Sequence, residues 1–232
     1  MTIAVILAGG LGTRLRSVVP DLPKPMAIIS GRPFLQYLMD YWIGQGVEQF
    51  ILSVGYKKES IIDYFGDLYQ EIPVKYVEEA LPLGTGGGVL QASQHLTKPF
   101  LLLNGDTYFK VSLSKLVQFH EQASSDWTFS LFRAEESNRY GGFEIETNGK
   151  IQALKSETSV VGALSNGGVC YVHPKVMHQS GFKLGIRHSL EDEVIPKLIA
   201  DKRNLYGIEF KTQFIDIGVP KDYLKAQGVL RT

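Results

Sequence analysis

Cysteine is nearly absent from this sequence of 232 residues, in which Cys170 is the only one. A single cysteine cannot form an intramolecular disulfide, and the cysteine clusters that hold structural zinc are excluded as well. Disulfides belong mainly to proteins of oxidising compartments. The sequence therefore favours a reducing, cytoplasmic location.

Net charge is absent too, because 24 lysine and arginine residues balance 24 aspartate and glutamate residues along the chain. Proteins that bind nucleic acid or an anionic membrane surface usually carry a basic patch. We therefore expect small-molecule substrates as partners, and neither nucleic acid nor membrane. The sequence leaves open whether copies of the chain form a homo-oligomer.

Long hydrophobic runs are missing, and no stretch approaches the roughly 18 apolar residues that span a bilayer. The apolar run at residues 3–8 has no basic segment before it and leads into a glycine-rich loop, so it predicts a buried strand and not a signal peptide. The chain also lacks internal repeats, linkers and low-complexity tracts. We expect residues 1–232 to form one domain with two halves, 1–125 and 126–232.

Strands and helices alternate in the first half. The β-branched strand Ile3–Leu7, apolar side chains at helical spacing between residues 34 and 42, and a strand at 48–54 form a β-loop-α-β unit. The alternation continues with helices near 59–65 and 87–95 and strands at 73–77 and 100–103. Such a series is typical of a doubly wound, mostly parallel sheet.

The second half is richer in strands. Residues 127–132, 142–146 and 168–172 are strand-like, which favours an α+β arrangement on the same sheet. A capping Ser189 followed by acids predicts a helix, and a last strand at 213–217 leads into a helix with Pro220 in its first turn. The whole predicts an α/β protein with a Rossmann-like, three-layer α/β/α fold around a central mixed, mostly parallel sheet.

The loop at residues 7–14 follows the first predicted strand and has glycine at positions 9, 10 and 12. Glycines let backbone N–H groups converge on a phosphate, and Thr13 and Arg14 add a hydroxyl and a guanidinium that bind phosphate oxygens. A dinucleotide fingerprint is excluded because it needs a small residue at Leu15, and the Gly-Lys-Ser/Thr ending of a P-loop is missing. The glycines alone fit a tight turn with an exposed arginine equally well.

Three further charged residues lie at positions where they can contact a phosphate group or a metal ion. Lys24 lies between Pro23 and Pro25, which biases it toward an extended backbone from which it can place a charge on a phosphoryl group. Asp106 and Asp216 each lie near the end of a predicted strand, where ligands of open α/β sheets collect. Together they can hold one Mg²⁺ with substrate phosphates, whereas singly each fits a turn cap, and an isolated Lys24 fits a solvated loop.

These motifs resemble those of the sugar-1-phosphate nucleotidyltransferase family, whose fold is that of nucleotide-diphospho-sugar transferases. The likeness runs from Ile3 to Tyr223 and joins the loop at 7–14 to Pro23-Lys24-Pro25, and residues 83–87, 104–106 and 216–220 agree with it. Within the family, residues 15–27 are most similar to the D-glycero-D-manno-heptose 1-phosphate guanylyltransferases. Enzymes that act on mannose 1-phosphate come next.

The resemblance implies a role for each matching residue. The nucleotide would be bound by Leu7, Ala8, Gly9, Gly10, Gly12, Thr13, Arg14, Lys24, Gly84, Thr85, Gly86 and Asp106. The sugar phosphate would be bound by Gly105, Tyr140, Gly141, Lys155, Asn166 and Glu191. Catalysis would rest on Arg14, Lys24, Asp106 and Asp216, with the two aspartates holding Mg²⁺ as cofactor. The first half of the chain would then bind the nucleotide and the second half the sugar.

Alternatives remain for the sugar residues. Tyr140 also fits the core, Gly141 a bulge, Asn166 a turn, and Glu191 an acid that complements a helix dipole. The family often has a Glu-Lys pair after a Gly-x-Ile strand, whereas here Lys155 would have to act from a shifted position.

The implied reaction transfers GMP from GTP to D-glycero-D-manno-heptose 1-phosphate and releases pyrophosphate. Its NDP-sugar product would serve a lipopolysaccharide, capsule or S-layer glycan. Mannose 1-phosphate or another hexose phosphate is the alternative acceptor. A non-catalytic nucleotide-sugar-binding subunit is a second hypothesis, although all four charged residues expected for catalysis are present. A nicotinamide oxidoreductase fails at Leu15.

Overall fold

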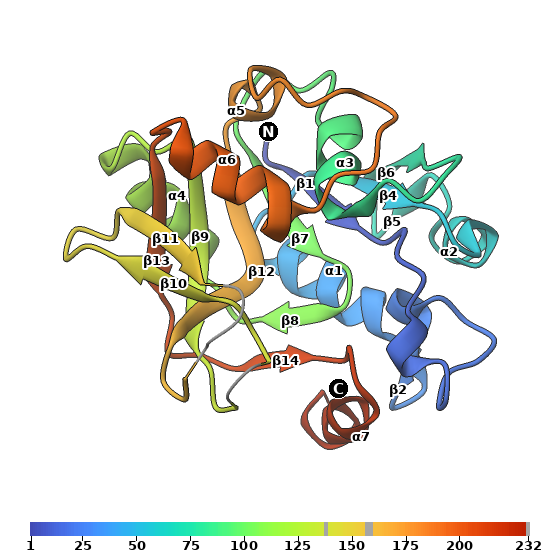
Figure 1. The fold of residues 1–232 in the computed structure, drawn as a ribbon. Coiled ribbons are helices and arrows are strands. Elements are labelled where there is room, and N and C mark those ends of the chain that lie inside the picture. Colours follow the sequence, from blue (N-terminus) through green and yellow to red (C-terminus); the bar gives the residue numbers. More distant parts are fainter. Residues whose placement is uncertain (137–138, 156–159, 231–232) are drawn as a thin grey trace.

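Ten strands form one central sheet in the computed structural model, which describes residues 1–136, 139–155 and 160–230 (Figure 1). Its order is β11-β10-β12-β7-β1-β4-β6-β5, and β9 pairs with β12 and β13. The strands are β1 (Ile3–Leu7), β4 (Gln49–Val54), β5 (Leu68–Tyr69), β6 (Ile72–Glu78), β7 (Phe100–Asn104), β9 (Trp127–Arg133), β10 (Gly142–Ile145), β11 (Ile151–Lys155), β12 (Leu164–Val172) and β13 (Leu205–Glu209). Two short ladders join β2 (Ile28–Ile29) to β3 (Arg32–Pro33) and β8 (Thr107–Phe109) to β14 (Phe214–Asp216).

The centre of the sheet is parallel. β1 pairs in parallel with β4 and β7, and β4 pairs in parallel with β6. β12 runs antiparallel to both β7 and β9, so strands from the second half of the chain continue the sheet of the first half. The predicted α/β fold with a mixed, mostly parallel central sheet is confirmed.

Helices cover both faces of this sheet (Figure 1). They are α1 (Phe34–Gly44), α2 (Lys58–Phe65), α3 (Gly84–Ala92), α4 (Leu113–Gln122), α5 (Lys175–His178), α6 (Ile195–Ala200) and α7 (Pro220–Val229). Ser189 caps the helical segment that leads into α6, as its sequence predicts, and its Oγ accepts a hydrogen bond from the Asp192 N–H at 3.1 Å. Among the described residues, no helix has both the length and the apolar character needed to cross a bilayer.

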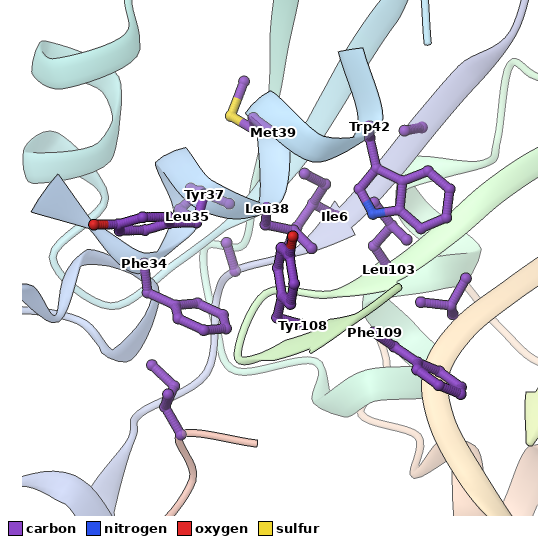
Figure 2. Packing of buried hydrophobic residues seen from close by; sticks show 14 of the residues in the cluster. Ile6, Phe34, Leu35, Tyr37, Leu38, Met39, Trp42, Leu103, Tyr108 and Phe109 are labelled. Atoms are coloured by element: carbon purple, nitrogen blue, oxygen red, sulfur yellow. The ribbon is translucent and has the colours of Figure 1, made fainter. Parts of the chain in front are cut away.

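Two hydrophobic cores hold the central strands from opposite faces. Ile6 and Leu103 pack with Trp42 of α1 on one face (Figure 2), whereas Val5 packs with Val89 of α3 on the other. This alternation follows from the two-residue period of a strand. Each fully buried aliphatic side chain stabilises the fold by about 1.5–3 kcal/mol. The carboxyl end of β1, where the glycine loop begins, is therefore fixed from both sides.

Several elements differ from the sequence expectation. α3 begins at Gly84 and not at Gly87, although glycine disfavours helix. The N–H groups of Gly86 and Gly87 donate to the His188 carbonyl at 2.9 and 3.3 Å, so tertiary contacts with a distant loop set this helix start. α4, β11 and β13 are not among the predicted elements, although Leu113, Leu116 and Val117 of α4 follow helical spacing behind a capping Ser112.

A buried histidine links α4 to the sheet. His120 Nδ1 lies 2.9 Å from Thr128 Oγ1, and the imidazole packs edge-on against the ring of Tyr171. Burial, together with the nearby His173, lowers the pKa of His120 from 6.5 to about 4. The folded protein therefore keeps this imidazole neutral where the unfolded chain protonates it.

Folding stability is expected to fall as the pH is lowered from 6.5 toward 4, because in this window the unfolded chain binds a proton that folded His120 does not. The loss amounts to at most about 1.4 kcal/mol per pH unit. His120→Asn keeps a polar partner for Thr128 and should flatten this dependence in urea unfolding measured between pH 4 and 8. Parallel pH profiles for the wild type and the variant would contradict the account.

Candidate active site

The loop after β1 contains two glycines that lie close to neighbouring segments. Gly12 has a φ of +59°, and a Cβ there would lie 3.3 Å from Lys24 Cβ. A Cβ on Gly9 would lie 2.6 Å from Glu79 Oε1. Only glycine adopts a positive φ and such close approaches without strain. The loop is thereby drawn against Lys24 on one side and Glu79 on the other.

A cavity of about 440 Å³ opens over this loop. It is lined by Leu7, Ala8, Gly9, Gly10, Leu11, Gly12, Thr13, Arg14, Lys24, Pro25, Glu79, Pro82, Gly84, Thr85, Asn104, Gly105, Asp106 and Arg187. The lining includes every residue that the sequence predicts to contact the nucleotide, with the exception of Gly86. Gly86 is buried beneath the cavity wall, where a Cβ would lie 2.7 Å from Val194 Cγ2.

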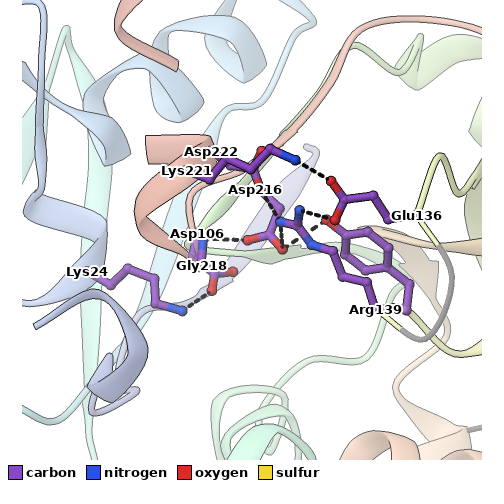
Figure 3. Close-up of polar contacts among 9 residues, drawn as sticks. Lys24, Asp106, Glu136, Arg139, Asp216, Gly218, Lys221 and Asp222 are labelled. Carbon is purple, nitrogen blue, oxygen red and sulfur yellow. Dashed lines mark hydrogen bonds and ion pairs between the residues drawn. The ribbon is translucent and has the colours of Figure 1, made fainter. Parts of the chain in front are cut away.

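Lys24 and Asp106 meet at one wall of this cavity. Lys24 lies in a short 3-10 turn, and its Nζ donates to Asp106 Oδ2 at 2.7 Å (Figure 3). Both side chains are largely shielded from solvent, with 11% and 29% exposed. The proline-flanked lysine and the strand-end aspartate, 82 residues apart in sequence, are thus brought together as two opposite charges.

Asp216 lies beside Asp106, because β14 pairs with β8 and the Ile217 N–H donates to the Asp106 carbonyl at 3.0 Å. Its side chain, however, faces a second cavity of about 540 Å³. There Asp216 Oδ2 accepts hydrogen bonds from Arg139 Nη2 at 3.3 Å and from the Tyr140 hydroxyl at 3.1 Å (Figure 3). The two aspartates are neighbours through their backbones, and their side chains line different cavities.

The donor chemistry of these two aspartates fits a hard divalent cation. Mg²⁺ is commonly bound through one or two carboxylates and takes its remaining ligands from substrate phosphates and water. In the described part of the chain, no group of three or more His, Cys, Asp or Glu side chains is placed to hold a metal ion. A metal here would therefore depend on the substrate to complete its coordination.

Glu191 is joined to the cavity over the glycine loop through Thr85. The Thr85 hydroxyl donates to Glu191 Oε2 at 3.2 Å and accepts a hydrogen bond from the Leu190 N–H at 2.9 Å. Burial raises the pKa of Glu191, while the hydrogen bond from Thr85 acts in the opposite direction. Glu191, which is expected to bind the sugar phosphate, is thus hydrogen-bonded to Thr85, which is expected to bind the nucleotide.

Of the other residues expected to bind the sugar phosphate, Tyr140 lines the second cavity and Gly105 lines the first. Burial and the charge of Asp216 raise the pKa of Tyr140, so its hydroxyl stays protonated and donates. Asn166 Oδ1 accepts the Gly168 N–H at 3.0 Å beside a bulge in β12, and Gly141 precedes β10. Neither Gly141 nor Asn166 lines either cavity, whereas Gly105 lines the first. Lys155 ends β11, and its side chain lies outside the described residues.

Comparison with known proteins decides the family. The sequence profile of the nucleotidyl transferase family matches residues 3–232. The chain belongs to the nucleotidyl transferase family. It is 42% identical over 229 residues to a D-glycero-alpha-D-manno-heptose 1-phosphate guanylyltransferase of Aneurinibacillus thermoaerophilus, with 98% of each chain covered. It is 36% identical to a protein of the same name from Campylobacter jejuni, with 95% of this chain and 96% of that one covered.

A solved structure agrees with these relatives. The crystal structure of HddC from Yersinia pseudotuberculosis complexed with GMP-PN superposes on this nucleotidyl transferase with a TM-score of 0.85 at 34% sequence identity. The superposition covers 100% of both chains.

Two cavity residues of this nucleotidyl transferase carry no sequence motif. Glu79 follows β6, and its carboxylate accepts hydrogen bonds from the Ser53 hydroxyl at 2.9 Å and the Leu83 N–H at 3.0 Å. Its place at the end of a predicted strand, just before residues 83–87, is the signal that could mark it. Arg187 reaches the cavity from an exposed loop, which no local pattern indicates.

Substitutions of Gly86 and Gly10 distinguish an effect on core packing from an effect inside the cavity. Gly86→Ala places a methyl group against Val194 and His188, and we expect it to destabilise the fold by about 1–3 kcal/mol. A Cβ on Gly10 meets nothing within 4 Å, so Gly10→Ala should fold normally yet lose activity, because the methyl group stands in the cavity. Urea unfolding and turnover, measured on both variants, test this. Equal losses of stability would show that the two glycines serve the same purpose.

Proposed function

We propose that the protein transfers GMP from GTP to D-glycero-D-manno-heptose 1-phosphate and releases pyrophosphate. A phosphate oxygen of the sugar 1-phosphate attacks the α-phosphorus of GTP in line, and the bond from that phosphorus to the pyrophosphate oxygen breaks. The observation that carries the proposal is the cavity in which the glycine loop, Arg14, Lys24 and Asp106 converge. The acceptor sugar rests on the 42% identity to a heptose 1-phosphate guanylyltransferase along nearly the whole chain.

Charge is the main obstacle in this reaction, because two polyanions have to meet. Phosphoryl-type transfer needs little covalent chemistry from the protein, so catalysis depends on positioning and on electrostatic stabilisation. Arg14 would hold phosphate oxygens with its planar guanidinium, and Lys24 would place a point charge at the α-phosphate. Both line the cavity, and the contact of Lys24 with Asp106 fixes the ammonium group at its wall.

Mg²⁺ is the cofactor we propose, with Asp106 and Asp216 as its protein ligands. When bound, the ion would neutralise part of the charge that develops on the phosphate oxygens. The backbone contact between Ile217 and Asp106 keeps the two aspartates adjacent whatever their side chains contact. We also propose a cytoplasmic location and a role in supplying activated heptose for a surface glycan. Cys170 is buried and forms no disulfide, so the fold does not depend on an oxidising compartment.

Glu79 supports guanine as the base. Guanine presents its N1–H and 2-amino donors side by side, and a carboxylate can accept both. Uracil and thymine instead present one N–H between two carbonyl oxygens, which a carboxylate repels. Glu79 lines the cavity, and each of its oxygens accepts one hydrogen bond from the protein, which leaves lone pairs for a ligand.

The test is a matrix of the four nucleoside triphosphates against heptose, mannose and glucose 1-phosphates, scored by pyrophosphate release with and without Mg²⁺. We expect the highest kcat/KM for GTP with the heptose phosphate, and no turnover in EDTA. Highest activity with mannose 1-phosphate would overturn the proposed acceptor. Binding of the substrates without pyrophosphate release in any combination would favour a non-catalytic subunit.

The same matrix run on Glu79→Gln tests the base assignment. Glutamine keeps the size of the side chain and offers one acceptor and one donor, so it matches guanine less well. A loss of about 1–3 kcal/mol is expected for one mismatched polar contact, which corresponds to roughly 5- to 150-fold in kcat/KM for GTP. Preference among the acceptor sugars should stay as in the wild type, which serves as the internal control. An unchanged preference for GTP over UTP would exclude Glu79 as the base-selecting group.

A further inference from the structure

Arg139 is the centre of a charge cluster beside Asp216 (Figure 3). Its guanidinium forms ion pairs with Asp216 at 3.3 Å, with Glu136 at 3.3 Å and with Asp222, and it stacks over the ring of Tyr140. Only 17% of the side chain is exposed. One largely buried arginine therefore links three acidic side chains, of which Asp216 is the proposed metal ligand.

The carboxylate of Asp216 is held at both oxygens. Oδ1 accepts the Gly218 N–H at 2.6 Å, while Oδ2 accepts Arg139 and Tyr140. An oxygen of a carboxylate accepts about two hydrogen bonds, so Oδ2 is saturated and Oδ1 keeps one lone pair. The contacts therefore fix the direction in which Asp216 can still bind a cation.

Asp222, another acidic partner of Arg139, lies on a helix that is anchored in the fold. Arg139 contacts Asp222 in the first turn of α7. α7 is in turn fastened to β2, because the Tyr223 hydroxyl and Gln227 Nε2 each donate to the Ile28 carbonyl at 2.8 Å. β2 directly follows the turn that carries Lys24. Through Arg139, the position of Asp216 is thus tied to the segment that places the catalytic lysine.

We propose that Arg139 is a positioning residue that orients Asp216 for the divalent cation by holding it and Asp222 at the same time. The inference rests on the proposed function, since it takes Asp216 as a metal ligand. Its rival is an inhibitory role, in which Arg139 is a counter-ion that competes with the metal for Asp216. The two roles differ in what the removal of the arginine does to metal affinity.

The charge balance of the cluster favours positioning. Lys221 pairs with Glu136 at 2.9 Å, and Asp222 offsets Arg139, so two cations face three carboxylates. The cluster therefore keeps an excess negative charge that Arg139 does not cancel. Outer contacts of this kind set the orientation of metal-binding carboxylates, and their loss costs about 10- to 100-fold in metal affinity or activity.

The experiment measures Mn²⁺ binding by electron paramagnetic resonance to the full-length protein with a non-hydrolysable GTP analogue. Arg139→Met should weaken Mn²⁺ binding about 10- to 100-fold, while binding of the analogue in EDTA stays unchanged. Arg139→Lys should lose less. The matched control is Arg133→Met, which removes an arginine that lines the same cavity and pairs with Glu209 at 3.0 Å, and should leave Mn²⁺ binding unaltered.

A second variant keeps the proposal falsifiable if Arg139→Met folds poorly in thermal unfolding. Asp222→Asn leaves Asp216 and Arg139 in place but removes the anchor and leaves the charge of Arg139 to Asp216 and Glu136. Positioning predicts weaker Mn²⁺ binding in both variants, whereas a competing counter-ion predicts tighter binding in Arg139→Met. Tighter or unchanged binding in a folded Arg139→Met, or in Asp222→Asn if Arg139→Met does not fold, would overturn the proposal.

The variant Asp216→Asn tests the proposed metal site separately from the proposed role of Arg139. If Asp216→Asn leaves Mn²⁺ binding unchanged, the proposed metal site itself is wrong. If Asp216→Asn weakens binding and Arg139→Met does not, only the role of Arg139 is wrong. When both weaken binding, Arg139→Met added to Asp216→Asn should cause no further loss, because the arginine acts through the aspartate.

Discussion

The parallel pairing of β1 with β7 is the constraint on which the site depends. Leu7 stands opposite Asn104 in this ladder, and the Gly105 N–H donates to the Leu7 carbonyl at 2.9 Å just beyond it. The glycine loop and Asp106 therefore leave the sheet side by side. Hydrophobic packing on both faces fixes these strand ends, so the polar groups that follow them need little further support. The antiparallel contact of β8 with β14 then adds Asp216 to the same edge.

Opposite charges in the site hold one another in place. Lys24 pairs with Asp106, and Arg139 joins Asp216 to Asp222, so the shielded charged groups have partners. A shielded charge without a partner is strongly destabilising, whereas a well-placed pair is tolerated. The Lys24–Asp106 pair and the group formed by Arg139, Asp216 and Asp222 have different expected roles. Lys24 is expected to turn toward the phosphates of the substrate, while Arg139 remains with its aspartates and directs one of them.

Local sequence patterns predict those parts of the site that lie next to strand ends or in short motifs. The glycine loop, Lys24 and Asp106 are of this kind, and the structure brings them into one cavity. The central sheet is predictable for the same reason, since buried parallel strands are continuous apolar runs. Family membership supplies what these patterns leave open, namely the class of reaction.

Contacts between distant segments could not be predicted in this way. The start of α3 depends on the His188 carbonyl, about a hundred residues further along the chain, which outweighs the low helix propensity of Gly84 and Gly86. Glu79 lies close to Gly9 only in the folded chain. Arg139 likewise joins its local neighbour Glu136 to Asp216, which is 77 residues away in sequence, and to Asp222. Such residues carry no motif, because their surroundings exist only in the folded chain.

The most direct test of the account is the position of the metal. Anomalous scattering from Mn²⁺ in crystals grown with a non-hydrolysable GTP analogue locates the ion without reference to activity. The account predicts one strong peak in coordination contact with carboxylate oxygens of both Asp106 and Asp216, with Lys24 on the phosphates. A peak bound to the phosphates alone, or one that contacts neither aspartate, would contradict it.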